Sequence, residues 1–136
     1  MSMPKIQKND VVRYWKAGAN KCLQLAHDVF VKKYYDHALF CGHLALEKLL
    51  KAKIVESTNG PAPFSHDLLY LAGLAKMEVT TEQQKQLTTI NTFNIAGRYP
   101  EEKFEFHKRI TKSISEQWLK TINELYVWFS KQPKKS

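Results

Sequence analysis

An arginine and a tyrosine stand together near the end of one helical pattern, in the run INTFNIAGRYP. The guanidinium of Arg98 offers a planar fork of hydrogen-bond donors that suits a phosphate or a carboxylate, and the ring of Tyr99 can stack on a base. Asn94, one turn earlier, lies on the same side and can orient Arg98. In the alternative reading Arg98 bonds helix C-terminal carbonyls or a glutamate, Tyr99 packs under the next segment, and Asn94 satisfies a buried backbone group.

A second set of candidate residues makes a compact charged edge on a helix: Glu47, Lys48 and Lys51. Glu47 and Lys51 have the i, i+4 order that stabilises a helix by roughly 0.2 to 0.5 kcal/mol, which predicts a local ion pair. In the alternative, Glu47 bridges to Arg98 across the bundle, and Lys48 or Lys51 meets a phosphate.

Histidines supply a third kind of candidate. His66 follows a proline-containing loop at the start of a short helix, where it can contact an anion or change protonation near neutral pH, or simply pack and bond a loop carbonyl. His37 with Cys41, and His43 with Glu47, have the i, i+4 spacing of metal ligands. No third or fourth ligand has an obvious place, so we expect no metal. No glycine-rich phosphate loop, serine nucleophile motif or acid pair stands out, and we assign no catalytic residue.

The composition is that of a small, basic, globular protein. Its 136 residues, 43% hydrophobic and 25% charged, predict one domain over 1–136, with a basic disordered tail at 132–136. The net charge of +8 favours a polyanionic partner such as RNA, DNA, a nucleotide or an acidic protein. We expect a cytoplasmic protein that does not enter a membrane, because no long apolar run and no signal peptide is found. Cys22 and Cys41 fall at apolar or small positions typical of reduced core thiols.

The apolar periodicity predicts an all-α protein, an antiparallel bundle of four long helices plus one short helix. The long helices are expected at about 10–31, 36–56, 80–96 and 111–130, and the short one at about 66–76. The second of them is central: its stripe from Tyr35 to Lys53 is mostly apolar or small and should face the core. Gly42 and Ala45 in that stripe let another backbone approach closely.

Capping residues support these helix starts. Asn9 or Asp10, Asp36 and Ser65 are expected N-caps, and Thr80 with Gln83 has capping-box spacing. Residues 101–109 alternate between charged and aromatic side chains, as a strand does. Because no other strand is available to pair with it, we expect an extended crossover loop.

Three segments, taken in order, resemble the HEPN domain family: DHALFCGHLALEKLLKA at 36–52, SHDLLYLA at 65–72 and INTFNIAGRYPEEK at 90–103. Together with the last helix, the resemblance covers nearly the whole chain. It implies a small helical bundle that usually forms a homodimer, is often encoded beside a minimal nucleotidyltransferase, and is associated with nucleotide or RNA binding.

Many members of that family are ribonucleases, commonly the toxin of a toxin and antitoxin pair. Their signature is an arginine followed, after four to six residues, by a histidine, with two such sites meeting across the dimer. In this chain eight residues separate Arg98 from His107, and no histidine follows Arg109. The Arg-Tyr-Pro form resembles the branch of the family that lacks the ribonuclease motif.

The resemblance and the charge together predict a noncatalytic or weakly active module that binds a nucleotide or RNA as a dimer, with a nucleotidyltransferase partner and without a cofactor. The ligand-binding residues are expected to be Arg98, Tyr99, Asn94, Glu47, Lys48, Lys51 and His66. One alternative is a metal-independent endoribonuclease that uses Arg98 and His107. Another is a protein-interaction domain whose exposed aromatic residues bind a protein alone.

Overall fold

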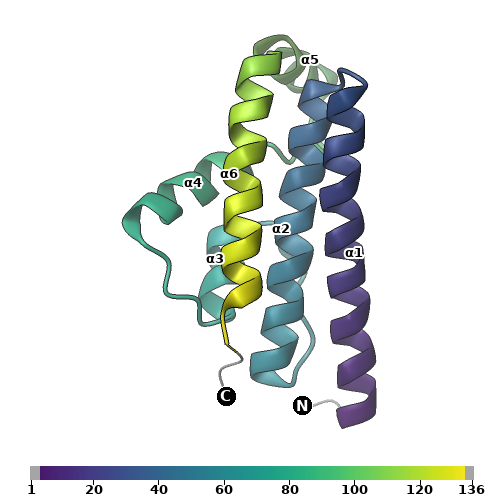
Figure 1. Ribbon diagram of the computed structural model, residues 1–136, viewed down its shortest axis with the longest axis vertical. Coiled ribbons are helices and arrows are strands. Elements are labelled where there is room, and N and C mark those ends of the chain that lie inside the picture. The colour runs from purple at the N-terminus through teal and green to yellow at the C-terminus, as the bar shows by residue number, and fades with distance from the viewer. Residues whose placement is uncertain (1–3, 134–136) are drawn as a thin grey trace.

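Three long helices form the body of the protein, which the computed structural model describes from residue 4 to residue 133. They are α1 (Lys5–Val31), α2 (Tyr35–Thr58) and α6 (Lys112–Lys131), and α2 lies between the other two (Figure 1). Three shorter helices, α3 (Leu68–Leu74), α4 (Thr81–Asn91) and α5 (Pro100–Arg109), connect α2 to α6. No strand occurs within residues 4–133, so the predicted all-α bundle is confirmed.

The two long neighbours of α2 run in opposite directions. α1 is antiparallel to α2, as the short connection between them predicts, whereas α6 is parallel to α2. Near the start of α6 the Ser115 hydroxyl donates to the Tyr35 carbonyl at 2.8 Å, and near its end the Lys53 ammonium donates to the Gln132 carbonyl at 3.1 Å. The three short helices return the chain to the first end of α2, where α5 closes the bundle (Figure 1).

α2 is buried on nearly every side, because α1, α3 and α6 all pack against it. The predicted stripe, which includes Leu39, Leu46 and Leu49, lies in the core. Lys53 ends this stripe with a charge, and its ammonium bonds carbonyls at the end of α6 that have no partner within the helix. Burial lowers the pKa of Lys53.

Several predicted caps are wrong, because the helices do not begin where these residues predict. α1 begins at Lys5 after Pro4, so Asn9 and Asp10 lie inside the helix. Asp36 lies within the first turn of α2 and bonds side chains instead of capping it. Ser65 is also not the cap of α3; the Asp67 side chain accepts from the first-turn amides.

The other helix ends agree better with the sequence. The capping box of Thr80 and Gln83 is confirmed, although α4 ends at Asn91 instead of near residue 96. Thr111 caps α6 through a bond from the amide of Ile114. The predicted tail begins after α6, and its residues 134–136 lie outside the described part of the chain.

The prediction of an extended loop at 101–109 is wrong, because this segment forms α5. Pro100 stands at the start of the helix, where its fixed φ is favourable and its missing N–H costs nothing. Acidic residues fill the first turn and basic residues the last, which complements the helix dipole. Phe106 is buried, with its ring centroid 6.0 Å from that of Phe93. These helical signals outweigh the two-residue alternation.

Both cysteines are free thiols, with Cys41 buried and Cys22 half-buried. Across residues 4–133, the structure contains no helix with the length and apolarity that a membrane crossing requires.

We expect Gly42 and Ile122 to be energetically coupled, because a Cβ added at Gly42 would lie 2.7 Å from Ile122 Cδ1 in the core. Gly42→Ala should lower the free energy of unfolding by about 1 to 2 kcal/mol, overpacking being partly offset by better helix propensity. Ile122→Val removes the clashing methyl group and alone should cost about 0.5 to 1.5 kcal/mol. The double variant should lose less than the two single variants combined, measured by urea unfolding.

Gly73→Ala is the matched control, since a Cβ there meets no atom within 4 Å. This variant should be neutral or stabilising. Additive losses in the Gly42 and Ile122 variants would contradict the close contact between α2 and α6.

Candidate functional site

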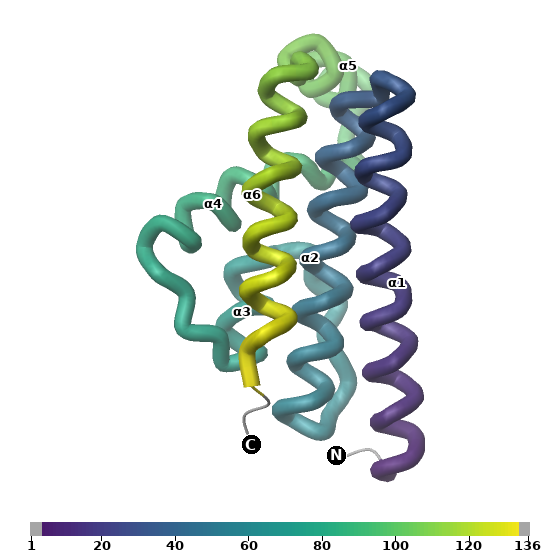
Figure 2. The backbone as a smooth tube through the Cα atoms, viewed as in Figure 1, coloured from purple at the N-terminus to yellow at the C-terminus, as the bar shows by residue number. Residues whose placement is uncertain are grey.

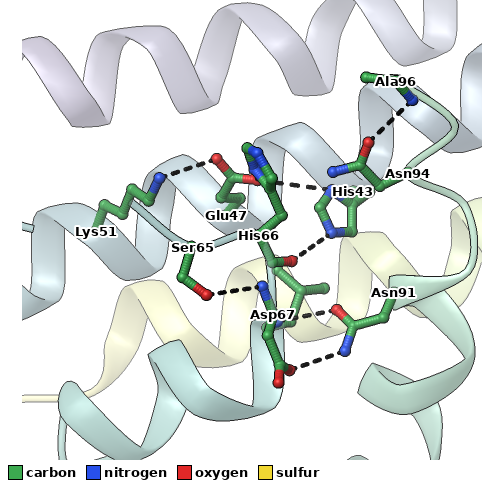
Figure 3. Close-up of polar contacts among 10 residues, drawn as sticks. His43, Glu47, Lys51, Ser65, His66, Asp67, Asn91, Asn94 and Ala96 are labelled. Atoms are coloured by element: carbon green, nitrogen blue, oxygen red, sulfur yellow. Dashed lines mark hydrogen bonds and ion pairs between the residues drawn. The ribbon is translucent and has the colours of Figure 1, made fainter. Parts of the chain in front are cut away.

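The centre of the candidate site is the Glu47 carboxylate, which α2 presents toward the loop between α2 and α3. The side chain is only 7% exposed, so its charge needs partners close by. One carboxylate oxygen accepts a bond from the Lys51 ammonium at 3.1 Å, and the other lies 2.8 Å from Nδ1 of His66 (Figure 3). Glu47 therefore joins a cation on its own helix to a histidine on the following loop.

Lys51 extends this cluster toward α1. Its ammonium lies 5.5 Å from the ring centroid of Trp15, within the range of a cation–π interaction. The predicted local ion pair between Glu47 and Lys51 is confirmed. The alternative bridge to Arg98 is wrong: among residues 4–133, no ion pair joins Arg98 to Glu47, whose two oxygens are already occupied.

His43, one turn before Glu47, fixes the backbone of the same loop. Its side chain is fully buried, and Nε2 lies 3.0 Å from the His66 carbonyl oxygen, which can only accept. This contact assigns the proton to Nε2 and leaves Nδ1 without a hydrogen-bond partner, 3.9 Å from a Glu47 oxygen. Burial lowers the pKa of His43, although the neighbouring Glu47 charge acts in the opposite direction.

The far side of the loop is tied to α4. The Asn91 carbonyl oxygen accepts from the Leu68 amide at 2.9 Å, and its amide group donates to Asp67 at 2.9 Å (Figure 3). The amide of Asp67 donates to the Ser65 hydroxyl at 3.2 Å. α2 and α4 thus hold residues 65–68 from two sides.

Two side chains of this tightly held loop remain open to solvent. The His66 side chain is 71% exposed although Glu47 holds its Nδ1, so Nε2 is available to a ligand. Phe64, two residues earlier, is fully exposed and offers a ring for stacking. A preoriented imidazole two residues from a free aromatic ring can bind a phosphate or a hydroxyl together with a planar base.

The remaining predicted residues lie away from this cluster. Arg98 is half-buried in a groove along α5, together with Glu101, Glu102 and Glu105, and Tyr99 beside it is exposed. The Asn94 side chain accepts from the Ala96 amide at 3.2 Å, which agrees with its structural alternative.

The Lys48 side chain lies against Gly18 of α1. A Cβ added at Gly18 would come within 3.3 Å of Lys48 Cδ. Of the predicted set, the structure therefore brings together Glu47, Lys51 and His66.

His107 does not meet Arg98 either. Its Nδ1 lies 3.0 Å from a carboxylate oxygen of Asp36, and it does not line the groove that contains Arg98. The pairing required by the endoribonuclease alternative is not formed in this chain.

Sequence reasoning missed four residues that shape the site: Trp15, His43, Phe64 and Asn91. The sequence shows the i, i+4 spacing of His43 and Glu47. This spacing indicates two side chains on one helix face, and it does so whether or not they bind a metal. The run Pro61-Ala62-Pro63-Phe64 also carried a signal, because a phenylalanine between prolines and a helix cap has few core neighbours. Nothing local in the sequence indicates the bond from Asn91.

Comparisons with known proteins place the fold. The HEPN domain family matches residues 12–132. The crystal structure of TT1696 from Thermus thermophilus is similar, with a TM-score of 0.71, 20% sequence identity, and coverage of 88% of this chain and 95% of that chain. At this identity the likeness concerns the fold alone. No curated protein matches the sequence significantly.

We expect Glu47→Gln to destabilise the protein by about 3 to 5 kcal/mol, because it leaves the buried Lys51 ammonium without its counter-charge. The double variant Glu47→Gln, Lys51→Met removes both charges and should be less destabilised than Glu47→Gln alone. Urea unfolding measures both. Glu124→Gln, at an exposed position on α6, is the control and should change stability by less than about 0.5 kcal/mol. If Glu47→Gln were as stable as Glu124→Gln, the buried ion pair between Glu47 and Lys51 would be contradicted.

The buried His43 predicts a pH dependence of stability. Its folded-state pKa lies below the ordinary 6.5, so the unfolded chain takes up a proton first as the pH falls. The contribution of neutral His43 to the free energy of unfolding is complete above about pH 6.5, and it declines as the pH falls toward the folded-state pKa. Between about pH 7.5 and 5.5 the wild type should lose more unfolding free energy than His43→Gln, which keeps an N–H donor but does not titrate.

His27→Gln should keep the wild-type dependence, because His27 is exposed on α1. Equal pH profiles for wild type and His43→Gln would show that His43 is not buried in its neutral form.

Proposed function

The chain belongs to the HEPN domain family, as its three ordered segments predict, and from this premise we propose that it is a nucleotide- or RNA-binding module. The proposal includes a homodimer in the cytoplasm and a nucleotidyltransferase partner, both of which rest on the family. The observation that carries the binding role is the exposed His66 ring, which the buried Glu47 carboxylate holds at 2.8 Å.

The fixed orientation of His66 is what makes it suitable for binding. His43 holds the backbone of His66, and Glu47 holds its ring. Binding of a ligand therefore costs little conformational entropy of this side chain. Nε2 points to the ligand side and can bond a phosphate oxygen when protonated, or accept from a ribose hydroxyl when neutral. Lys51 neutralises Glu47, which limits repulsion of an anionic ligand by the buried carboxylate.

Phe64 supplies the second element of recognition. A fully exposed phenylalanine loses no core packing when a base stacks on it, and stacking tolerates any base. Together, one ring that binds the sugar–phosphate and one ring that stacks on the base favour a single nucleotide or an unpaired RNA segment over a duplex.

Arg98 and Tyr99 are proposed as a separate, base-directed contact. Three glutamates share the groove with Arg98, Lys108 and Arg109, so the charges of its lining balance and the groove does not attract a phosphate by net charge. Carboxylates and a guanidinium suit the donors and acceptors of a base edge, while the exposed Tyr99 can stack. We therefore assign phosphate to His66 and leave Arg98 to the base.

The test is fluorescence anisotropy with a labelled unstructured RNA, together with thermal shifts in ATP and GTP. Phe64→Ala should weaken RNA binding by about 1 to 3 kcal/mol, the value of one stacked base. Tyr14→Ala is the matched control, since Tyr14 is an exposed aromatic residue on α1. His66→Gln should also weaken binding, whereas His27→Gln should not.

Other outcomes identify other functions. No RNA retention and no thermal shift at millimolar nucleotide, with one stable protein complex in a pull-down, would replace this proposal with a protein-interaction domain. RNA degradation that disappears in the Arg98→Ala, His107→Ala double variant would replace it with the endoribonuclease.

A further inference from the structure

A second buried carboxylate lies at the start of α2, away from Glu47. Asp36 is 5% exposed, and each of its oxygens meets a different histidine. Nδ1 of His37 lies 3.2 Å from one oxygen, and Nδ1 of His107, on α5, lies 3.0 Å from the other. One carboxylate therefore orients two imidazole rings that come from two helices.

Both rings are largely exposed at the protein surface. The side chains of His37 and His107 are 61% and 68% exposed, although Asp36 beneath them is buried. Because a carboxylate can only accept, Nδ1 of each ring carries the proton, which leaves Nε2 for a ligand. Tyr34 packs against the His37 ring edge to face, with centroids 6.2 Å apart, and helps to hold it.

Asp36 is charged in this position. Burial would raise its pKa, but the hydrogen bond from His107 and the charge of His37 outweigh burial, and the pKa is lowered. With both rings protonated, the cluster carries two positive charges and one negative charge.

Charges of both signs lie around the cluster. Figure 2 shows α5 crossing the end of the bundle where α1 turns into α2 and α6 begins. These elements contribute Asp28, Lys32 and Lys33 from the end of α1 and the α1–α2 connection, Glu101, Glu102, Lys103, Glu105, Lys108 and Arg109 from α5, and Lys112 and Glu116 from the start of α6. The cations outnumber the acids by one, six against five, and Lys108 lies 3.8 Å from Glu105.

We propose that His37 and His107, held by Asp36, form a binding site for a phosphate monoester dianion, as in inorganic phosphate, a mononucleotide or the 5′-phosphate of an RNA. Each protonated ring donates Nε2–H to a phosphate oxygen. A dianion with several oxygens matches two separate cationic donors better than a diester, which has a single charge. Within residues 4–133, no group of three histidine, cysteine or acidic side chains is arranged to hold a metal.

This site is independent of the one at Glu47, which lies about 16 Å further along α2 at 1.5 Å per residue. The direct test follows the ring C–H resonances of the histidines by NMR during titration with sodium phosphate, with sodium chloride at equal ionic strength as the reference. At about pH 7, where the phosphate dianion is well populated, the His37 and His107 signals should shift together and saturate, while the exposed His27 stays unmoved.

Variants separate a binding role from a structural one. His37→Gln keeps the bond between Asp36 and His107 and should weaken phosphate binding by about tenfold or more, whereas His27→Gln should leave it unchanged. Asp36→Asn should abolish the joint shift, since a neutral amide does not stabilise two imidazolium rings. Phe64→Ala should bind phosphate as the wild type does, so that failure here and failure of the proposed RNA site are distinguishable.

AMP and a 5′-phosphorylated RNA should reproduce the phosphate shifts, and the same RNA with a 5′-hydroxyl should not. The proposal is overturned if the shifts do not saturate, if His27 moves equally, if His37→Gln binds as the wild type does, or if the 5′-hydroxyl RNA is equivalent.

Discussion

The charge of Glu47 lies inside a helical bundle, and the neighbouring structure is arranged to compensate it. A carboxylate without partners in such a place would cost several kcal/mol, which is comparable to the whole stability of a small domain. Lys51 supplies one partner from the same helix, at no cost in chain closure, and His66 supplies the other from the following loop. The loop between α2 and α3 is therefore positioned by electrostatics, because little apolar surface within it is buried.

The same device occurs twice along α2. Asp36 and Glu47 are both buried acids, and each is bonded by an exposed histidine from another element, His107 of α5 and His66 of the loop. Short helices are marginal on their own, so tertiary contacts set where they dock; for α5 these include the buried Phe106 and the bond between His107 and Asp36. These contacts leave the rings of His66 and His107 at the surface with Nδ1 of each ring already bonded. Such rings are suited to ligands because binding removes little freedom.

The sequence predicted the parts of this structure that depend on local pattern. The long helices, the buried face of α2, the capping box at Thr80 and the pair of Glu47 with Lys51 follow from spacing within one segment. The errors involve partners distant in sequence. Asp36 has the composition of a helix cap, and only the fold brings His107 to it across 71 residues. Arg98 lies away from Glu47, in a groove along α5, and Lys51 and His66 satisfy the carboxylate instead.

The similarity to TT1696 shows how little sequence this architecture requires. A TM-score of 0.71 at 20% identity means that most positions can change while the helices keep their arrangement, provided that apolar periodicity is retained. The core therefore carries little information about the ligand. Buried polar side chains differ from the apolar core in this respect. Each of them costs free energy of desolvation, which a specific partner must offset. Among the described residues, Lys53 and Ser115 are buried polar groups that bond backbone carbonyls, whereas the buried Asp36 and Glu47 orient exposed imidazole rings. Those rings are where binding has to be sought.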